Sequence, residues 1–343
     1  MSEKSKNKTT RQAVNRIRHH NTTNSADVAA SLLHGDVAAL SQAITWVEST
    51  AAAHITQADE VLALCLPHSG NSLRVGITGV PGVGKSTFID ALGTHITGTG
   101  KKCAVLAVDP SSRISGGSIL GDKTRMEKLS LNPMAFIRPT PSASRLGGVA
   151  GKTREVMMLC EAAGYDVILI ETVGVGQSET VVHGMTDFFL LLTLAGAGDQ
   201  LQGIKRGIIE MCDALLINKA DGDNEQKAKR AAAEYIGALH LFPPSASGWQ
   251  PQVSTISSLT GSGIAECWQM ILQHQQWHTE RNLFTQKRDS QNEQWFAETF
   301  EHELKQHLYN NTGNREKMQQ AMQHVKSKAM TPREAARWIV QGG

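Results

Sequence analysis

The sequence lacks the features that mark three classes of protein. Its five cysteines include no CxxC pair, and an odd number offers neither a disulfide framework nor zinc-knuckle spacing. No apolar run approaches the roughly 20 residues that a membrane-spanning helix needs. A formal net charge of +2 over 343 residues gives no excess of one sign that would attract a nucleic acid or an anionic membrane. We therefore expect neither nucleic acid nor membrane among its partners.

The start of the chain is basic and rich in hydroxyl side chains, a composition that also occurs in organelle transit peptides. Glu3 and the lack of a clear apolar face argue against that interpretation. We expect a solvated tail, and by default a cytoplasmic location.

Hydrophobic spacing divides the chain into three zones. From about residue 11 to 66, and again from about 288 to the end, apolar residues recur at helical spacing. Between these zones, short apolar runs alternate with helical stretches. The predicted parts are an N-terminal helical extension over 1–66, a ligand-binding domain over 67–280 and a C-terminal helical segment over 281–343.

The apolar runs of the central zone are rich in valine, isoleucine and leucine, and most are apolar on both faces. Such runs are typical of parallel strands that helices cover on each side. Strands that alternate with helices predict an α/β fold, a doubly wound and mostly parallel sheet with its ligand at the carboxyl ends of the strands. The predicted strands are 73–78, 103–108, 166–170, 188–193, 214–218 and 252–257.

The last zone carries one apolar stripe, in which Phe296, Phe300, Leu304 and Leu308 are spaced four residues apart. Residues 331–334 read TPRE, a capping box with proline at the first helical position. Helices of this kind either pack on the parent domain or pair with another copy of the chain, and the residues leave both arrangements open.

A glycine-rich loop follows the first predicted strand. It reads GVPGVGKST and satisfies the phosphate-loop pattern GxxxxGK[ST], with a helix predicted directly after it. The glycines let main-chain N–H groups point at a phosphate, and the helix adds the positive end of its dipole. Lys85 would reach the β and γ oxygens, and Ser86 would bind Mg²⁺. The predicted phosphate-binding residues are Gly79, Val80, Pro81, Gly82, Val83, Gly84, Lys85, Ser86 and Thr87.

A second motif predicts which base accompanies the phosphates. Residues 218–221 read NKAD at the end of a predicted strand and match NKxD. Asp221 would accept the N1 and N2 hydrogens of guanine, which adenine does not offer. The stem of Lys219 would cover the ring, and Asn218 would hold the loop. At the end of the last predicted strand, Ser257, Ser258 and Leu259 stand where GTP-binding proteins place a small loop beneath the guanine. Together the motifs predict a site for GTP and GDP.

Acidic residues at neighbouring strand ends are the candidates for metal binding. Asp109 follows one predicted strand and Glu171 ends the next, so both are predicted Mg²⁺ ligands, direct or through water. Asp122 lies in the long glycine-rich segment 111–126 and could reach the metal or a water molecule. Each carboxylate could instead be an ordinary polar strand end or loop residue.

The segment after Glu171 has the composition of a switch. It reads TVGVGQS, and the Gly174 N–H group could sense the γ-phosphate. Gln177 invites comparison with a glutamine that orients the attacking water. We therefore predict GTP hydrolysis by in-line attack of water, with Lys85, Asp122 and Gln177 as candidate catalytic residues.

These motifs resemble those of the MeaB/ArgK family of GTPases, which includes the human protein associated with methylmalonic aciduria type A. The matching segments are GVPGVGKSTFIDALG, VDPSS, GDKTRM, ILIETVGVGQSE, GAGDQLQGIK and NKAD. The resemblance implies a P-loop GTPase that acts as a chaperone of adenosylcobalamin-dependent methylmalonyl-CoA mutase, gating cofactor loading and protecting or reactivating that enzyme. It also implies a homodimer held by C-terminal helices, and it makes Lys205 a catalytic relay between partner and nucleotide.

Two other functions stay open at this stage. One is a kinase of a lysine, arginine or ornithine transport component, and the other is a metal-insertion GTPase like the related nickel proteins. The sequence shows no separate signature for an acceptor substrate, which weighs weakly against the kinase. It also shows no histidine-rich or cysteine-rich metal-storage segment.

Overall fold

The computed structural model describes residues 24–108, 126–140, 146–172, 178–196, 206–243, 245, 247–310 and 312–341. The chain divides into two compact units, the first ending at Arg288 and the second beginning at Asp289. None of the helices in these ranges has the length and apolarity needed to cross a lipid bilayer.

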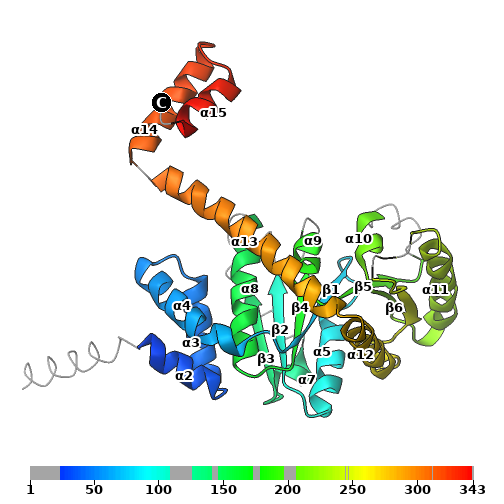
Figure 1. Cartoon of the computed structure of the whole chain (residues 1–343). Coiled ribbons are helices and arrows are strands. Elements are labelled where there is room, and N and C mark those ends of the chain that lie inside the picture. The colour runs from blue at the N-terminus through cyan, green and yellow to red at the C-terminus, as the bar shows by residue number, and fades with distance from the viewer. Residues whose placement is uncertain are drawn as a thin grey trace, which may run out of the picture. The chain divides into compact units, whose positions relative to one another are not determined.

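The first unit is built on a seven-stranded sheet (Figure 1). The strand order is β3-β2-β4-β1-β5-β6-β7, and every neighbouring pair runs parallel. This order confirms the predicted doubly wound α/β sheet, because β1 lies inside the sheet and the chain proceeds to strands on both sides of it. The strands are β1 (Leu73–Gly79), β2 (Cys103–Val108), β3 (Ala135–Thr140), β4 (Val167–Thr172), β5 (Phe188–Leu194), β6 (Ala214–Asn218) and β7 (Gln252–Thr255).

Strand β3 is absent from the sequence-based prediction. It reads AFIRPT and lies at the edge of the sheet, where it pairs with β2. An edge strand can hold Pro139, which has no N–H group to donate, and the polar Arg138. The strand therefore lacks the continuous apolar run by which its neighbours were recognised.

Helices cover both faces of the sheet and give it two hydrophobic cores. Alternate side chains of β5 show the division, because Phe188 and Leu190 enter one core while Phe189 and Leu191 enter the other. The helices on the first face are α5 (Lys85–Gly98), α7 (Glu127–Ser130) and α12 (Ile264–Glu280). Those on the second face are α8 (Leu146–Ala162), α9 (Ser178–His183), α10 (Arg206–Met211) and α11 (Glu225–Leu239).

Three N-terminal helices belong to the same compact unit as the sheet. They are α2 (Ser25–Leu33), α3 (Val37–Glu48) and α4 (Ala52–Cys65), followed by the short η1 (Leu66–His68). Asp36 separates the first two, and its carboxylate accepts from the Ala38 N–H group at 2.7 Å as an N-cap. Leu40 and Ile44 are fully buried in the core shared with α8 and the sheet. From residue 24 onward, the predicted helical lead-in is therefore present and packs on the central domain.

The first unit ends on a charged contact at the amino end of the sheet. Arg288 lies early in α13 (Leu283–Asn310), and its Nη2 atom is 2.7 Å from Oδ2 of the buried Asp187. Lys287 adds a hydrogen bond from Nζ to the main-chain oxygen of Asp187 at 2.8 Å. These bonds fasten the start of α13 next to β5.

The second unit consists of the rest of α13, α14 (Thr312–Lys326) and α15 (Pro332–Val340). The predicted capping box opens α15, because Thr331 Oγ1 accepts from the Glu334 N–H group and Glu334 Oε2 accepts from that of Thr331. On α13 the first three residues of the predicted apolar stripe are exposed within the described chain, and Leu308 is partly buried. Phe296 is 72% exposed, Phe300 54% and Leu304 46%.

Candidate nucleotide-binding site

The predicted site residues within the described ranges come together at the carboxyl ends of four strands. The phosphate loop follows β1, Glu171 lies on β4, Asn218 ends β6 and Ser257 follows β7. In a parallel sheet these ends share one edge, which is where a doubly wound fold binds its ligand.

Steric crowding and backbone torsion fix the glycines of the phosphate loop. A Cβ atom on Gly79 would lie 2.4 Å from the main-chain oxygen of Leu192 on β5, so no side chain fits there. Gly84 has a φ of 96°, in the left-handed region, and stands at the N-cap of α5. Helix α5 therefore starts at Lys85 with its N-terminus at the loop, the arrangement that favours an anion.

Lys85 is tied to the first glycine of its own loop. Its Nζ atom donates to the main-chain oxygen of Gly79 at 2.7 Å. Burial lowers the pKa of the ammonium group, while the carboxylates of Glu171 and Glu179 act to raise it. The side chain thus lies across the phosphate loop, where burial outweighs the two nearby carboxylates and lowers its pKa overall.

Ser86 and Glu171 form a pair of oxygen ligands. The Ser86 hydroxyl donates to Glu171 Oε1 at 3.2 Å, and Glu171 is only 5% exposed. Two ligands at right angles on an octahedral Mg²⁺, each about 2.0–2.1 Å from the ion, lie about 2.9 Å apart. The spacing and the all-oxygen chemistry of this pair fit that ion.

Asn218 joins three loops of the site. Its Nδ2 atom donates to the main-chain oxygen of Val83 at 2.8 Å. Its Oδ1 atom accepts from the main-chain N–H group of Ser258 at 3.1 Å and from the Ser258 hydroxyl at 2.8 Å. The side chain is 1% exposed, so these bonds satisfy its buried polar atoms. The predicted role of Asn218 in holding the loop agrees with this geometry.

The other guanine-loop residues lie around Asn218. Lys219 Nζ donates to the main-chain oxygen of Gly82 at 2.9 Å and so reaches over the phosphate loop. The Ser257 hydroxyl donates to Oδ2 of Asp221, which holds the carboxylate in place. Leu259 is 81% exposed.

Five predicted residues lie outside the described part of the chain. They are Asp109, Asp122, Gly174, Gln177 and Lys205. Their metal-binding, γ-phosphate-sensing and catalytic roles therefore stay predictions.

Sequence reasoning missed two polar contacts at this edge. The Thr172 hydroxyl donates to that of Thr78 at 3.0 Å and links β4 to β1 directly behind the loop. Asn224 donates from its side-chain amide to the main-chain oxygen of Lys219 at 2.7 Å. No spacing pattern marks either residue, because each acts through a contact that only the folded chain creates.

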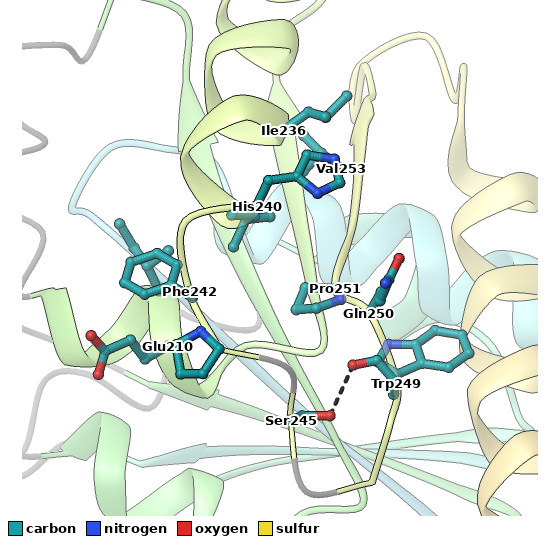
Figure 2. Close-up of a pocket in the computed structure, with 12 residues that line it drawn as sticks. Glu210, Ile236, His240, Phe242, Ser245, Trp249, Gln250, Pro251 and Val253 are labelled. Atoms are coloured by element: carbon teal, nitrogen blue, oxygen red, sulfur yellow. Dashed lines mark hydrogen bonds between the residues drawn. The ribbon is translucent and has the colours of Figure 1, made fainter.

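A separate pocket lies away from these strand ends. Figure 2 shows it between the last turn of α11 and the segment that leads into β7, with Glu210 of α10 at one side. Its volume is about 280 Å³, and Leu239, Phe242 and Val253 are among the apolar residues that line it. None of the predicted nucleotide-binding residues lines this pocket, so the candidate site is the strand-end edge.

Comparison with known proteins identifies the family. The family model described as methylmalonyl-CoA mutase-associated GTPase MeaB matches residues 40–313. The chain belongs to this family. GTPase ArgK of Escherichia coli is 45% identical over 319 residues, which cover 92% of this chain and 96% of that protein. The mitochondrial methylmalonic aciduria type A homolog of Mus musculus is 45% identical over 315 residues, covering 89% and 76%.

A solved structure supports the same conclusion. The crystal structure titled LAO/AO transport system kinase is 39% identical, has a TM-score of 0.73 and covers 94% of this chain and 98% of that one. The resemblance to the MeaB/ArgK family is therefore confirmed over most of the chain. As a member of the MeaB family, the protein is a GTPase and binds guanine nucleotides.

Proposed function

We propose that this MeaB-family GTPase is a chaperone of adenosylcobalamin-dependent methylmalonyl-CoA mutase, gating cofactor loading and protecting or reactivating the enzyme. The name of the family, methylmalonyl-CoA mutase-associated GTPase MeaB, supports the mutase as the partner. The observation that carries the nucleotide part is the Asn218 contact, since one buried side chain binds both the phosphate loop and the loop beneath the base. A nucleotide that spans both loops would therefore be held by a single preformed unit.

We assign the described residues from this geometry, and Asp109, Asp122, Gly174, Gln177 and Lys205 from the sequence motifs and the family resemblance. Main-chain N–H groups of the phosphate loop and Lys85 would hold the β and γ phosphates, and Asp221 would select guanine. Ser86 and Glu171, with Asp109 and Asp122, would hold Mg²⁺, which when bound neutralises charge that develops on the phosphoryl oxygens. Gly174 would sense the γ-phosphate, Gln177 would orient the attacking water, and Lys205 would relay the state of the site to the partner.

We further propose a homodimer formed through α13. Phe296 and Phe300 stack with ring centroids 6.1 Å apart, and both are more than half exposed. Two adjacent exposed aromatic rings with Leu304 beside them form an apolar face that a second copy of the same helix could cover.

A second candidate function is a kinase of a transport component, because the related protein of known structure is named an LAO/AO transport system kinase. The two functions differ in where the γ-phosphate goes. In a GTPase it leaves as free orthophosphate, whereas in a kinase it becomes bound to a protein.

The test uses γ-labelled GTP and purified methylmalonyl-CoA mutase. We expect the label to appear as orthophosphate, and we expect the immobilised protein to retain the mutase in an amount that differs between a non-hydrolysable GTP analogue and GDP. Lys85→Ala, which lacks the ammonium group, is the matched control for hydrolysis. Label on a protein would favour the kinase. A mutase that is not retained with either nucleotide would overturn the chaperone proposal.

A further inference from the structure

Asn224 stands at a helix start but does not cap the helix. It is the last residue of the short 3-10 helix η3 (Gly222–Asn224), which leads directly into α11, and its backbone is already helical, with φ of −89° and ψ of −10°. Its side chain accepts no hydrogen bond from the first turn of α11. Its amide instead turns back by five residues and donates to the main-chain oxygen of Lys219 at 2.7 Å.

The residue that receives this bond has an unusual backbone conformation. Lys219 has a φ of 58°, in the left-handed region, which costs a residue other than glycine of order 1 kcal/mol or more. Such a conformation persists only where neighbouring contacts hold it. Lys219 has two, the Asn224 amide on its main-chain oxygen and Gly82 as the acceptor for its side chain.

The main chain of the same asparagine belongs to η3. Its N–H group donates to the main-chain oxygen of Asp221 at 3.1 Å, which is the i→i−3 bond of that 3-10 helix. Asn224 therefore bonds to two main-chain oxygens of the segment, that of Lys219 through its side chain and that of Asp221 through its main chain. Both bonds act on the residues that flank or carry the predicted guanine contact.

A simpler explanation is that Asn224 merely starts α11. The helix does not depend on it for that, because its side chain satisfies none of the free N–H groups of the first turn. Glu225 already supplies a negative charge in that turn, which favours the positive end of the helix dipole. The side-chain amide therefore stabilises the loop that begins at Lys219, and it makes no contribution to the start of α11.

We propose that Asn224 is a positioning residue for guanine recognition. It holds Lys219 in the left-handed conformation and thereby presents the Asp221 carboxylate and the Lys219 stem to the base before the nucleotide arrives. The inference rests on the proposed assignment of guanine binding to Asp221. Loss of the amide should reduce affinity for guanine nucleotides, while the phosphate loop and the hydrolytic groups stay intact.

The test compares substitutions that keep a good N-cap but remove the amide. Asn224→Ser is neutral, caps helices well and has a side chain too short to reach the Lys219 oxygen. Losing one such bond corresponds to a rise of about 5- to 10-fold in the dissociation constant for GTP. KM for GTP should rise by a similar factor with kcat within about twofold of wild type. Asp223→Ala, on the same loop, is the matched control.

Several outcomes separate the possibilities. GTP affinity of Asn224→Ser within twofold of wild type, in a folded protein, would overturn the proposal. If the serine variant fails to fold, Asn224→Asp decides instead, because aspartate caps helices as well as asparagine and also lacks the amide donor. If the wild type binds ATP as tightly as GTP, or if Asp221→Asn leaves GTP affinity unchanged, the assignment of guanine binding to Asp221 fails. If Asp221→Asn weakens GTP binding but Asn224→Ser does not, only the proposal for Asn224 fails.

Discussion

The side-chain amide of Asn218 donates to the main-chain oxygen of Val83 across 2.8 Å, joining the end of β6 to the loop after β1. The two segments lie far apart in the sequence, and each carries one half of the proposed nucleotide site. Because the same side chain also accepts two bonds from Ser258, the position of the phosphate loop and that of the base loop are not independent.

We expect Asn218→Ala to weaken both the fold and the nucleotide site. The substitution leaves the Val83 oxygen and the Ser258 N–H group without their partner in a buried place, which costs roughly 1–3 kcal/mol of unfolding free energy. Affinity for GTP should fall by about tenfold or more. Urea denaturation and nucleotide titration measure the two effects. Asn292→Ala, at an exposed position on α13, should change neither, and a full-affinity Asn218→Ala protein would contradict the proposed link.

Asp221→Asn should exchange base preference. The carboxylate accepts two hydrogens from guanine, whereas an amide offers a donor and an acceptor, which suits the 2-oxo group of xanthine. We expect affinity for GTP to fall by at least tenfold and affinity for xanthosine triphosphate to rise, because a missing or mismatched hydrogen bond leaves polar groups unpaired. Competition titrations with both nucleotides measure the change, and an unaltered preference would rule out Asp221 as the base-selecting residue.

The exposed stripe on α13 predicts the oligomeric state. Replacing Phe296 and Phe300 together by serine removes the largest apolar groups of the stripe, so the proposed homodimer should dissociate to monomers in light scattering coupled to gel filtration. The GTPase unit should keep its intrinsic activity. Lys305→Ser changes a 68% exposed side chain of the same helix and should leave the dimer intact. A wild-type protein that is monomeric at every concentration would refute the prediction.

The buried carboxyl group of Glu155 should make the stability of the fold depend on pH. Burial raises the pKa of this carboxyl group on α8 from 4.5 to about 7, with nearby Asp59 acting in the same direction and Lys152 opposing it. An acid with a raised pKa stabilises the fold below its unfolded pKa, and that contribution is lost as pH rises from about 4.5 through 7.

We therefore expect Glu155→Gln to raise the unfolding free energy at pH 8 by roughly 1–3 kcal/mol and to change it little at pH 4.5. The glutamine stays neutral at both pH values, so the loss that the wild type suffers should disappear. Denaturation curves of the two proteins at each pH provide the measurement. Equal stability of the two proteins at pH 8 would show that Glu155 ionises freely.

Most of the sheet could be predicted because its strands are buried on both faces. The run CAVLAV coincides with β2, and ALLIN with β6, since a parallel strand under two layers of helices must be apolar throughout. Strand β3 could not be predicted in this way, because its position at the edge permits Arg138 and Pro139.

The site shows the same division between local and long-range information. The phosphate loop and the NKAD loop could be read from sequence because each is a short motif at a strand end. The contacts among them could not, since Asn224 reaches back to Lys219 and Thr172 meets Thr78 only after the chain has folded. Likewise, helical spacing predicted α3 but gave no sign that Ile44 would share a core with α8.

The crowding around Gly79 has a consequence for the variability of the phosphate loop. A methyl group at that residue would meet a main-chain oxygen of β5, whereas at Gly82 it would meet no atom within 4 Å and only a left-handed torsion, with φ of 78°. In a library that randomises both positions, asparagine should survive at residue 82 and glycine alone at residue 79. Glycine at residue 79 is thus required by the close approach of β1 and β5, independently of phosphate binding.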